Sequence, residues 1–284
     1  MEQKWLFVIT PKTKLIDLNL KEVWRYRDLL MLFVKRDVIT LYKQTILGPL
    51  WYLIQPLFTS VIFTLVFNDI AGIKTGTIPP FLFNLAGVTT WNYFKECLTA
   101  TSDTFKKNEQ IFGKVYFPRI IMPMSIIISN LLKFGIQLII LIVFYLYFVF
   151  FTEYDILPNI YIFLLPVLIV FMGMLGLGLG MIISSMVTKY RDLTFLVSFG
   201  VQLLMYMSAV MYPLDLMKEK LYNYSWIVEY NPMAHIIEMG RYMILNEGTV
   251  SLFGMIYTVS FSIIVLLLGI VIFNKTEKSF IDTI

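Results

Sequence analysis

The chain has 284 residues, of which 58% are hydrophobic, and a mean hydropathy of +0.75, which predicts one integral membrane unit with no stretch left for a separate soluble domain. The net charge of +4 is accounted for by topological signals, so it does not indicate nucleic-acid binding. A single cysteine, Cys97, excludes an internal disulfide bond and a metal site built from several cysteines.

Before the first long apolar stretch, residues 20–43 predict an amphipathic helix lying at the membrane surface. At about 100° per residue, basic and acidic side chains gather on one face, and Val23, Tyr26, Leu30, Val34, Val38 and Leu41 gather on the other. Such a helix places basic groups near lipid phosphates. Two interpretations stay open: an anchor that orients the first span, or a role in handling an anionic lipid substrate.

Six apolar stretches follow, at residues 50–67, 80–94, 120–151, 157–187, 195–214 and 252–273. A bilayer core of about 30 Å needs roughly 20 apolar residues in a helix. The second stretch is the weakest because Lys95 and Glu96 close it early. We predict an all-α membrane protein with six transmembrane helices and both termini cytoplasmic, because this places 17 of the 23 basic residues on the cytoplasmic side.

The first two spans carry polar and aromatic side chains. Gln55 supplies a polar group, and Pro56 predicts a kink because proline removes a helix hydrogen bond. Aromatic residues at these spans fit either an interfacial belt or a lining that stacks on sugar rings. They are Tyr42, Trp51, Tyr52, Trp91 and Tyr93.

The loop at residues 101–121, between the second and third spans, predicts a short amphipathic helix that exposes apolar side chains to the cytosol. These are Ile111, Phe112, Val115, Tyr116 and Phe117. Exposed apolar patches usually dock something, and we favour that interpretation. The alternative is a helix that lies back on its own membrane domain.

Lys133 is the one charge deep within a span, and Gln137 follows one turn later on the same face. Intramembrane charges usually face a cavity or a partner. Our hypothesis is that both residues line a pore, and the alternative is that Lys133 pairs with Glu96 on a neighbouring helix.

The run MGMLGLGLGM at residues 172–181 lies in the fourth span and does not match a nucleotide-binding pattern. Gly176, Gly180 and Ser184 recur at every fourth residue, which predicts close helix packing. The sequence contains no P-loop, so we expect no ATP hydrolysis by that route.

The external loop at residues 215–251 is too apolar to be merely solvated. We predict two short helices that dip into the outer leaflet, with a turn at Asn231-Pro232. His235 has no carboxylate or cysteine cluster around it in the sequence, so we expect a structural role for it.

Four blocks, in order along nearly the whole chain, together resemble the permease subunit of type-2 ABC exporters for O-antigen, capsule or teichoic acid. The first, at residues 29–57, carries a basic-Asp pair, then Tyr-Lys-Gln-Thr, Leu-Gly, Trp and Gln-Pro. The second is FGKVYFPRIIMP at residues 112–123. The third, at residues 189–214, carries Tyr190-Arg191-Asp192 and Tyr212-Pro213, and the fourth, at residues 230–245, carries Asn-Pro and a downstream Arg.

The resemblance implies a single type-2 ABC transmembrane domain over residues 1–284. Its parts are a cytoplasmic tail and interfacial helix at 1–46, a membrane region at 47–273 and a cytoplasmic tail at 274–284. It also implies roles for individual residues. A coupling helix that contacts the ATPase would include Lys107, Glu109, Phe112, Lys114, Tyr116 and Phe117. Lipid-diphosphate contacts would come from Arg25, Lys35, Arg36 and Lys43; a channel lining from Trp51, Gln55, Trp91, Tyr93, Lys133 and Gln137; and a gate from Tyr212, Pro213, Asn231, Pro232 and Arg241.

The function that this resemblance implies is export of a polyprenyl-diphosphate-linked polysaccharide across the bacterial inner or plasma membrane. The expected partners are a second copy of the chain, two copies of a cytoplasmic ABC ATPase, the lipid-linked polysaccharide and membrane lipids. We expect no catalytic residue, no metal and no cofactor in this chain, since ATP and Mg²⁺ would be bound by the ATPase. The alternatives are a type-2 ABC exporter of a small lipid or drug, or a flippase outside the ABC class.

Overall fold

The computed structural model describes residues 20–43, 47–112, 117–154, 156–190 and 192–281, and within these ranges the chain forms helices and loops without a strand. Four helices in this part of the chain are long and apolar enough to cross a membrane: Gly48–Ile70, Ile121–Phe151, Ile160–Lys189 and Leu252–Thr276. The all-α membrane fold is therefore confirmed. The count of six spans and the cytoplasmic placement of the termini stay predictions.

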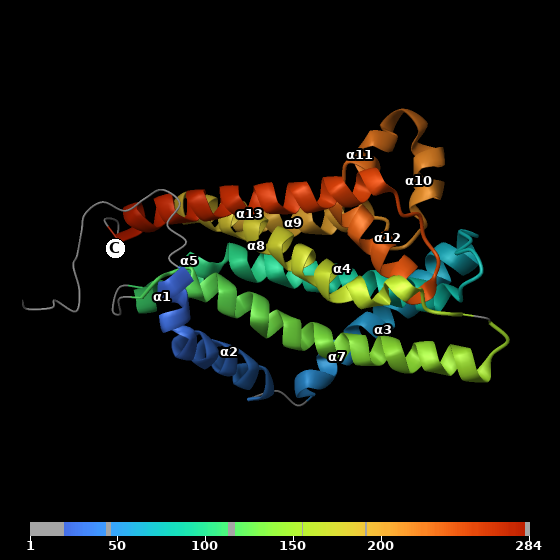
Figure 1. The fold of residues 1–284 in the computed structure, drawn as a ribbon, viewed down its shortest axis with the longest axis horizontal. Helices are drawn as coiled ribbons and strands as arrows, with labels where there is room; N and C mark the ends of the chain where they lie inside the picture. The colour runs from blue at the N-terminus through green and yellow to red at the C-terminus, as the bar shows by residue number, and fades with distance from the viewer. Residues whose placement is uncertain (1–19, 44–46, 113–116, 155, 191, 282–284) are drawn as a thin grey trace, which may run out of the picture.

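The body of the molecule is a bundle of long helices that run side by side (Figure 1). They are α4 (Pro80–Ser102), α7 (Ile121–Phe151), α8 (Leu165–Lys189, preceded by the 3-10 turn Ile160–Leu164) and α13 (Leu252–Ile281). Helix α8 packs on both α4 and α13, and α4 packs on α7. The shorter α3 (Trp51–Phe63), preceded by the 3-10 turn Gly48–Leu50 and prolonged by the π-helix Thr64–Ile70, lies against α4 and α7.

The two ends of this bundle differ in character. One end, which we name the basic end, carries four short helices: α1 (Leu20–Arg25), α2 (Arg27–Tyr42), α5 (Thr104–Lys107) and α6 (Glu109–Phe112). The opposite end carries the segment between α9 (Leu193–Tyr206) and α13. There α10 (Leu214–Leu221) and α11 (Ser225–Glu229), joined by the 3-10 turn Tyr222–Tyr224, project from the bundle, while α12 (Pro232–Leu245) packs into it against α4, α8 and α13 (Figure 1).

Helix α4 is the centre of the bundle and is longer than the sequence predicts. Its 23 residues rise about 34 Å at 1.5 Å per residue, and it ends at Ser102 instead of Phe94. Phe94 and Cys97 are completely buried, whereas Lys95 and Glu96, which we expected to close the helix, are partly exposed on its other side. The helix continues past the two charges because it can place them together on one face.

Close packing between α4 and α8 depends on the small residues that the sequence singles out. A Cβ atom at Gly176 would lie 2.8 Å from the Cβ of Cys97, and one at Gly180 would lie 2.5 Å from the Cβ of Thr101. Real Cβ atoms do not approach so closely, so only glycine lets the two helices meet at this distance. The predicted packing role of this glycine stripe is confirmed.

The fifth apolar stretch is not a full-length helix. We expected it to run to Leu214, but α9 ends at Tyr206 and rises only about 21 Å. The chain then leaves the helix, and Ala209 adopts a positive φ of 53°. The prediction of a continuous span over residues 195–214 is therefore wrong, because tertiary contacts of the segment after Tyr206 replace its helical hydrogen bonds.

The predicted amphipathic helix over residues 20–43 is broken at Tyr26 into α1 and α2. Leu30 and Val34, placed on its apolar face by the periodicity, are buried, and so is Phe33. These side chains pack with Phe112 and other residues of α6, α7, α8 and α13, so this helix is docked on the protein as well as being amphipathic.

The long loop before α13 forms the three helices α10, α11 and α12, where the sequence predicts two, and their insertion into the outer leaflet stays a prediction. Ile236 and Ile237 of α12 are completely buried, whereas Tyr222 and Trp226 of the α10–α11 hairpin are exposed. His235 is buried, and its Nε2 lies 2.8 Å from the carbonyl oxygen of Glu229, in agreement with a structural role.

Candidate functional site

Polar side chains from three helices converge in the membrane-spanning part of the bundle. We name this cluster the polar notch. Its lining consists of Tyr52 and Gln55 from α3, Asn92, Tyr93, Lys95 and Glu96 from α4, and Asn130, Lys133, Phe134 and Gln137 from α7. The three polar residues of α7 share one face because they are three and four residues apart. Lys133 and Gln137 flank the middle of this 31-residue helix, so the notch lies about half-way along α7.

The inner wall of the notch is polar, and its hydrogen-bonding groups are not all paired. Asn130 and Gln137 are only 2% and 6% exposed. Asn130 interacts with the buried thiol of Cys97, whereas Gln137 Oε1 has no hydrogen-bond partner among the described residues. The free space in the notch, about 20 Å³, is large enough for one water molecule. A buried polar atom without a partner costs roughly 1–3 kcal/mol, so Gln137 Oε1 requires a donor from a water molecule or a ligand.

Three charged side chains line the notch, and Lys133 is the one in the middle of α7. Its Nζ lies 5.4 Å from the centre of the Tyr52 ring, in the range of a cation–π interaction. No ion pair joins Lys133 to Glu96 in the part of the chain that the structure describes. The alternative prediction, a direct ion pair between α4 and α7, is therefore not observed. A lysine at this depth costs roughly 2.5–3.5 kcal/mol or more to insert, which is typical of a functional position.

A second polar cluster lies nearer the opposite end, and it is almost fully paired. Arg241 of α12 is 1% exposed, and its Nη1 donates to the carbonyl oxygen of Ala209 at 2.8 Å and to Oε1 of Glu238 at 3.3 Å. Its Nη2 donates to the carbonyl oxygen of Val210, and its guanidinium carbon lies 3.6 Å from the centre of the Phe83 ring on α4. We name these contacts the Arg241 network.

Glu238 extends this network to two further backbone groups. Its Oε1 accepts a hydrogen bond from the N–H of Leu214 at 3.1 Å, and its Oε2 accepts one from the N–H of Thr249 at 3.2 Å. The ion pair thus joins the irregular end of α9, the start of α10 and the loop before α13. Burial lowers the pKa of Arg241 to about 10, and the charge of Glu238 opposes this shift, so the guanidinium remains protonated at neutral pH.

Asn231 fastens the start of α12 to the same irregular segment. Its Oδ1 accepts a hydrogen bond from the N–H of Met233, and its Nδ2 donates to the carbonyl oxygen of Met207 and to Oγ of Ser208. This cap explains why α12 begins at Pro232, because proline at the first helical position lacks a donor that would need a partner.

With this geometry in place, comparison with known proteins identifies the family. The family model described as "ABC-2 type transporter" matches residues 28–245. The chain belongs to this family. Because ABC-2 permeases work with an ATPase subunit, this ABC-2 permease is a multi-pass membrane transport protein with an ATPase partner.

Curated relatives resemble the ABC-2 permease along nearly its whole length. An "O-antigen export system permease protein RfbA" of Klebsiella pneumoniae is 28% identical over 256 residues, which cover 90% of this chain and 94% of the relative. A second Klebsiella pneumoniae protein of that name is 28% identical over 259 residues, and one from Myxococcus xanthus is 23% identical over 264 residues, covering 93% of this chain and 98% of the relative.

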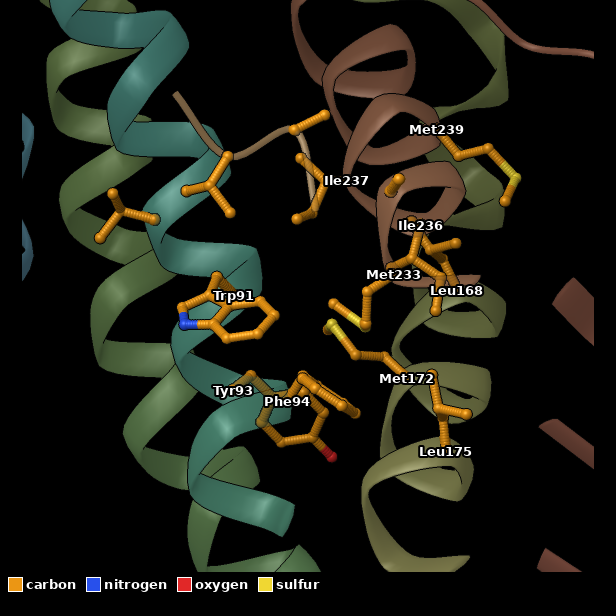
Figure 2. Packing of buried hydrophobic residues seen from close by; sticks show 14 of the residues in the cluster. Trp91, Tyr93, Phe94, Leu168, Met172, Leu175, Met233, Ile236, Ile237 and Met239 are labelled. Carbon is orange, nitrogen blue, oxygen red and sulfur yellow. The ribbon is translucent and has the colours of Figure 1, made fainter. Parts of the chain in front are cut away.

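Of the six residues predicted to line a channel, four meet in the polar notch: Gln55, Tyr93, Lys133 and Gln137. Their channel-lining role stays a prediction. Trp51 is 54% exposed on α3, outside the notch. The prediction for Trp91 is wrong for this conformation, since it is 1% exposed and points from α4 toward Met172 and Met233 in the core (Figure 2).

At the basic end, the predicted exposure of aromatic side chains is also wrong where the structure describes them. Phe112 and Phe117 are 7% and 4% exposed and pack on α2 and α7, because these apolar rings find cover within their own domain. Lys114 and Tyr116 lie outside the described residues. The exposed surface of α5 and α6 is polar instead. It consists of Lys106, Lys107, Glu109 and Gln110, with Lys107 paired to Asp103 at 3.1 Å.

The four residues predicted to contact a lipid diphosphate lie along α1 and α2. Arg25, Lys35 and Lys43 are exposed. Arg36 is partly buried, and its Nη2 lies 2.8 Å from Oδ1 of Asp37. Their contact with a diphosphate stays a prediction.

At the opposite end, the residues predicted to form a gate surround the Arg241 network: Tyr212 is buried, Pro213 precedes α10, and Asn231 and Pro232 begin α12. Their gating role also stays a prediction.

Reasoning from the sequence missed Asn92, Asn130 and Glu238. The spacing of Asn130 three residues before Lys133, and of Glu238 three residues before Arg241, was a signal that could have found two of them.

Proposed function

We propose that this chain is the permease subunit of an ATP-driven exporter that moves a polyprenyl-diphosphate-linked polysaccharide across the bacterial inner or plasma membrane. The observation that carries the proposal is the similarity to O-antigen export permeases over about nine tenths of the chain. The aligned lengths are 256 to 264 of the 284 residues, so the likeness concerns most of the transport domain.

In this proposal the ATPase binds the exposed polar surface of α5 and α6 at the basic end. Helix α4 ends at Ser102, directly before α5, and runs through the bundle to the Arg241 network at Phe83. A displacement of α5 by the ATPase would therefore pass along one continuous helix to the opposite end. Packed interfaces switch between discrete arrangements instead of deforming gradually, which suits alternating opening and closing.

A second copy of the chain would cover α9. This helix is apolar, and Phe195, Leu196 and Phe199 are 82%, 66% and 62% exposed. Lipid can also cover such a face, so the homodimer, with two copies of the ATPase, belongs to the proposal. A polysaccharide path between two such subunits would need no catalytic group in this chain.

The test is to deplete the protein in its host and analyse surface glycan together with lipid-linked intermediates inside the cell. Loss of surface glycan with accumulation of lipid-linked polymer inside is the expected result. Re-expression of the wild-type chain should restore the surface glycan, and so should Lys220→Met, which alters an exposed side chain of α10. An unchanged glycan profile would contradict the proposal and favour export of a small lipid or drug.

A further inference from the structure

The polar notch contains chemistry that packing does not explain. Lys133 projects from the middle of an apolar helix, and Gln137 Oε1 is buried without a hydrogen-bond partner among the described residues. The Arg241 network shows that the same fold can satisfy buried polar atoms elsewhere. A cluster left incomplete in this way is typical of a site that a ligand completes.

The groups in the notch specify the chemistry of that ligand. Lys95 and Lys133 bring two ammonium groups to the notch and Glu96 brings one carboxylate, so the lining carries one net positive charge and favours an anionic group such as a phosphate. The free acceptor of Gln137 requires a donor on the ligand, such as a hydroxyl group. A ligand that offers acidic oxygens and a hydroxyl together is a sugar phosphate or a glycerol phosphate.

The surroundings of the notch suit a lipid. Gln55 is exposed at its mouth, and Phe58 and Ile62 follow on the same face of α3 at helical spacing, 65% and 53% exposed. This apolar stripe offers a surface along which a hydrocarbon chain can lie. Because the enclosed part holds only about 20 Å³, it accepts one oxygen-bearing group, and the remainder of a headgroup would stay at the mouth.

We propose that the polar notch binds the phosphorylated, hydroxyl-bearing headgroup of a lipid whose chain lies along Phe58 and Ile62. Lys133 and Lys95 neutralise the phosphate at the mouth of the notch, and the buried Gln137 Oε1 accepts a hydrogen bond from one hydroxyl group of the headgroup. The argument for a phosphorylated lipid in the notch holds whatever the protein exports. That this lipid is the exported substrate rests on the function proposed above.

The experiment measures lipid binding to the purified full-length protein in nanodiscs of phosphatidylcholine by native mass spectrometry. The two probes are a polyprenyl diphosphate carrying one sugar and phosphatidylglycerol. We expect Lys133→Met to weaken binding about tenfold or more, because a hydrogen bond to a charged group is lost, and Gln137→Leu to weaken it several-fold. Lys133→Arg keeps the charge and should bind within about threefold of wild type.

Lys220→Met is the matched control, since it removes an exposed lysine of α10 far from the notch and should leave binding unchanged. A loss confined to the polyprenyl probe identifies the notch as a substrate site, and an equal loss for phosphatidylglycerol identifies a site for a resident phospholipid. Unchanged binding of both probes in Lys133→Met and Gln137→Leu overturns the proposal. Lipid binding is measured separately from export. The proposal for the notch can therefore be overturned while the proposed function stands, and the proposed function can be overturned while lipid binding in the notch stands.

Discussion

The Arg241 network and the polar notch both bring charged and polar side chains into an apolar bundle. They differ in how completely the buried polar atoms are paired. Apart from its Nε, the Arg241 guanidinium is paired with two carbonyl oxygens and a carboxylate, and that carboxylate accepts two backbone N–H groups. In the notch, Gln137 Oε1 has no hydrogen-bond partner among the described residues, and the one contact of the Lys133 ammonium seen in that part of the chain is with the face of Tyr52.

This difference separates two uses of buried polarity. A satisfied network in a low-dielectric interior strongly favours one backbone arrangement, so it can hold an irregular segment such as residues 207–213 in place. An unsatisfied cluster weakens the fold and persists when another molecule completes it. Substitutions in the Arg241 network should therefore affect stability, whereas substitutions in the notch should affect binding.

The largest effect is expected at Arg241. Arg241→Met leaves the Glu238 carboxylate buried without its counter-ion and frees the carbonyl oxygens of Ala209 and Val210, so the protein should lose about 3–5 kcal/mol of stability. Thermal unfolding of the purified protein in detergent measures the loss. The double variant Arg241→Met with Glu238→Gln should recover part of it, because the unpaired charge is gone; a single variant as stable as wild type would contradict the structural role of the network.

A matched pair of glycines tests the same contrast through packing. A Cβ at Gly87 of α4 would lie 2.4 Å from Arg241 Nη2 and 2.5 Å from the carbonyl oxygen of Val210, whereas one at Gly135 of α7, between Lys133 and Gln137, would meet nothing within 4 Å. Gly87→Ala should cost about 1–3 kcal/mol through overpacking. Gly135→Ala should gain up to about 1 kcal/mol, since alanine favours the helix. Equal unfolding temperatures for the two variants would show that the Arg241 network is not tightly packed.

Removal of the notch lysine should have the opposite sign from removal of Arg241. Lys133→Met deletes a charge from the middle of α7, and the gain is only partly offset by the lost contact with Tyr52, so stability should rise by about 1 kcal/mol. The same unfolding assay measures this change. A fall comparable to that of Arg241→Met would mean that Lys133 stabilises the fold, and it would end the distinction between the two clusters.

The smallest effect is expected for an ion pair at the basic end. Lys107 is paired with Asp103 at 3.1 Å, but its side chain is 65% exposed. Lys107→Ala should therefore change the stability of the isolated permease by less than about 0.5 kcal/mol. Co-purification with the ATPase provides the second measurement, and weaker co-purification at unchanged stability is the result that the proposed docking surface predicts.

Much of the membrane fold could be predicted from local pattern. The apolar stretches around α3, α7, α8 and α13 needed only hydropathy, and close packing of α8 needed only the spacing of its small residues, although the spacing did not identify α4 as the partner. Three predictions failed for one shared reason. The extent of α4, the early end of α9 and the burial of Phe112 all depend on neighbours distant in sequence, which periodicity does not contain.

The candidate sites divide in the same way. Lys133 and Gln137 stand out in the sequence because a charge and an amide interrupt an apolar run, but Asn92 and Asn130 acquire meaning only when α4 and α7 bring them together. Arg241 could be recognised as unusual, but its partners at Ala209, Val210 and Phe83 come from other segments.

The sequence by itself determined that the chain is an all-α membrane protein, because burial of apolar side chains in lipid and internal satisfaction of backbone hydrogen bonds are local demands on each segment. Only the tertiary structure decided which polar groups are paired and which are left open. Pairing is a property of atoms on different helices, since a donor on one segment is satisfied or orphaned by what the fold places within about 3 Å of it.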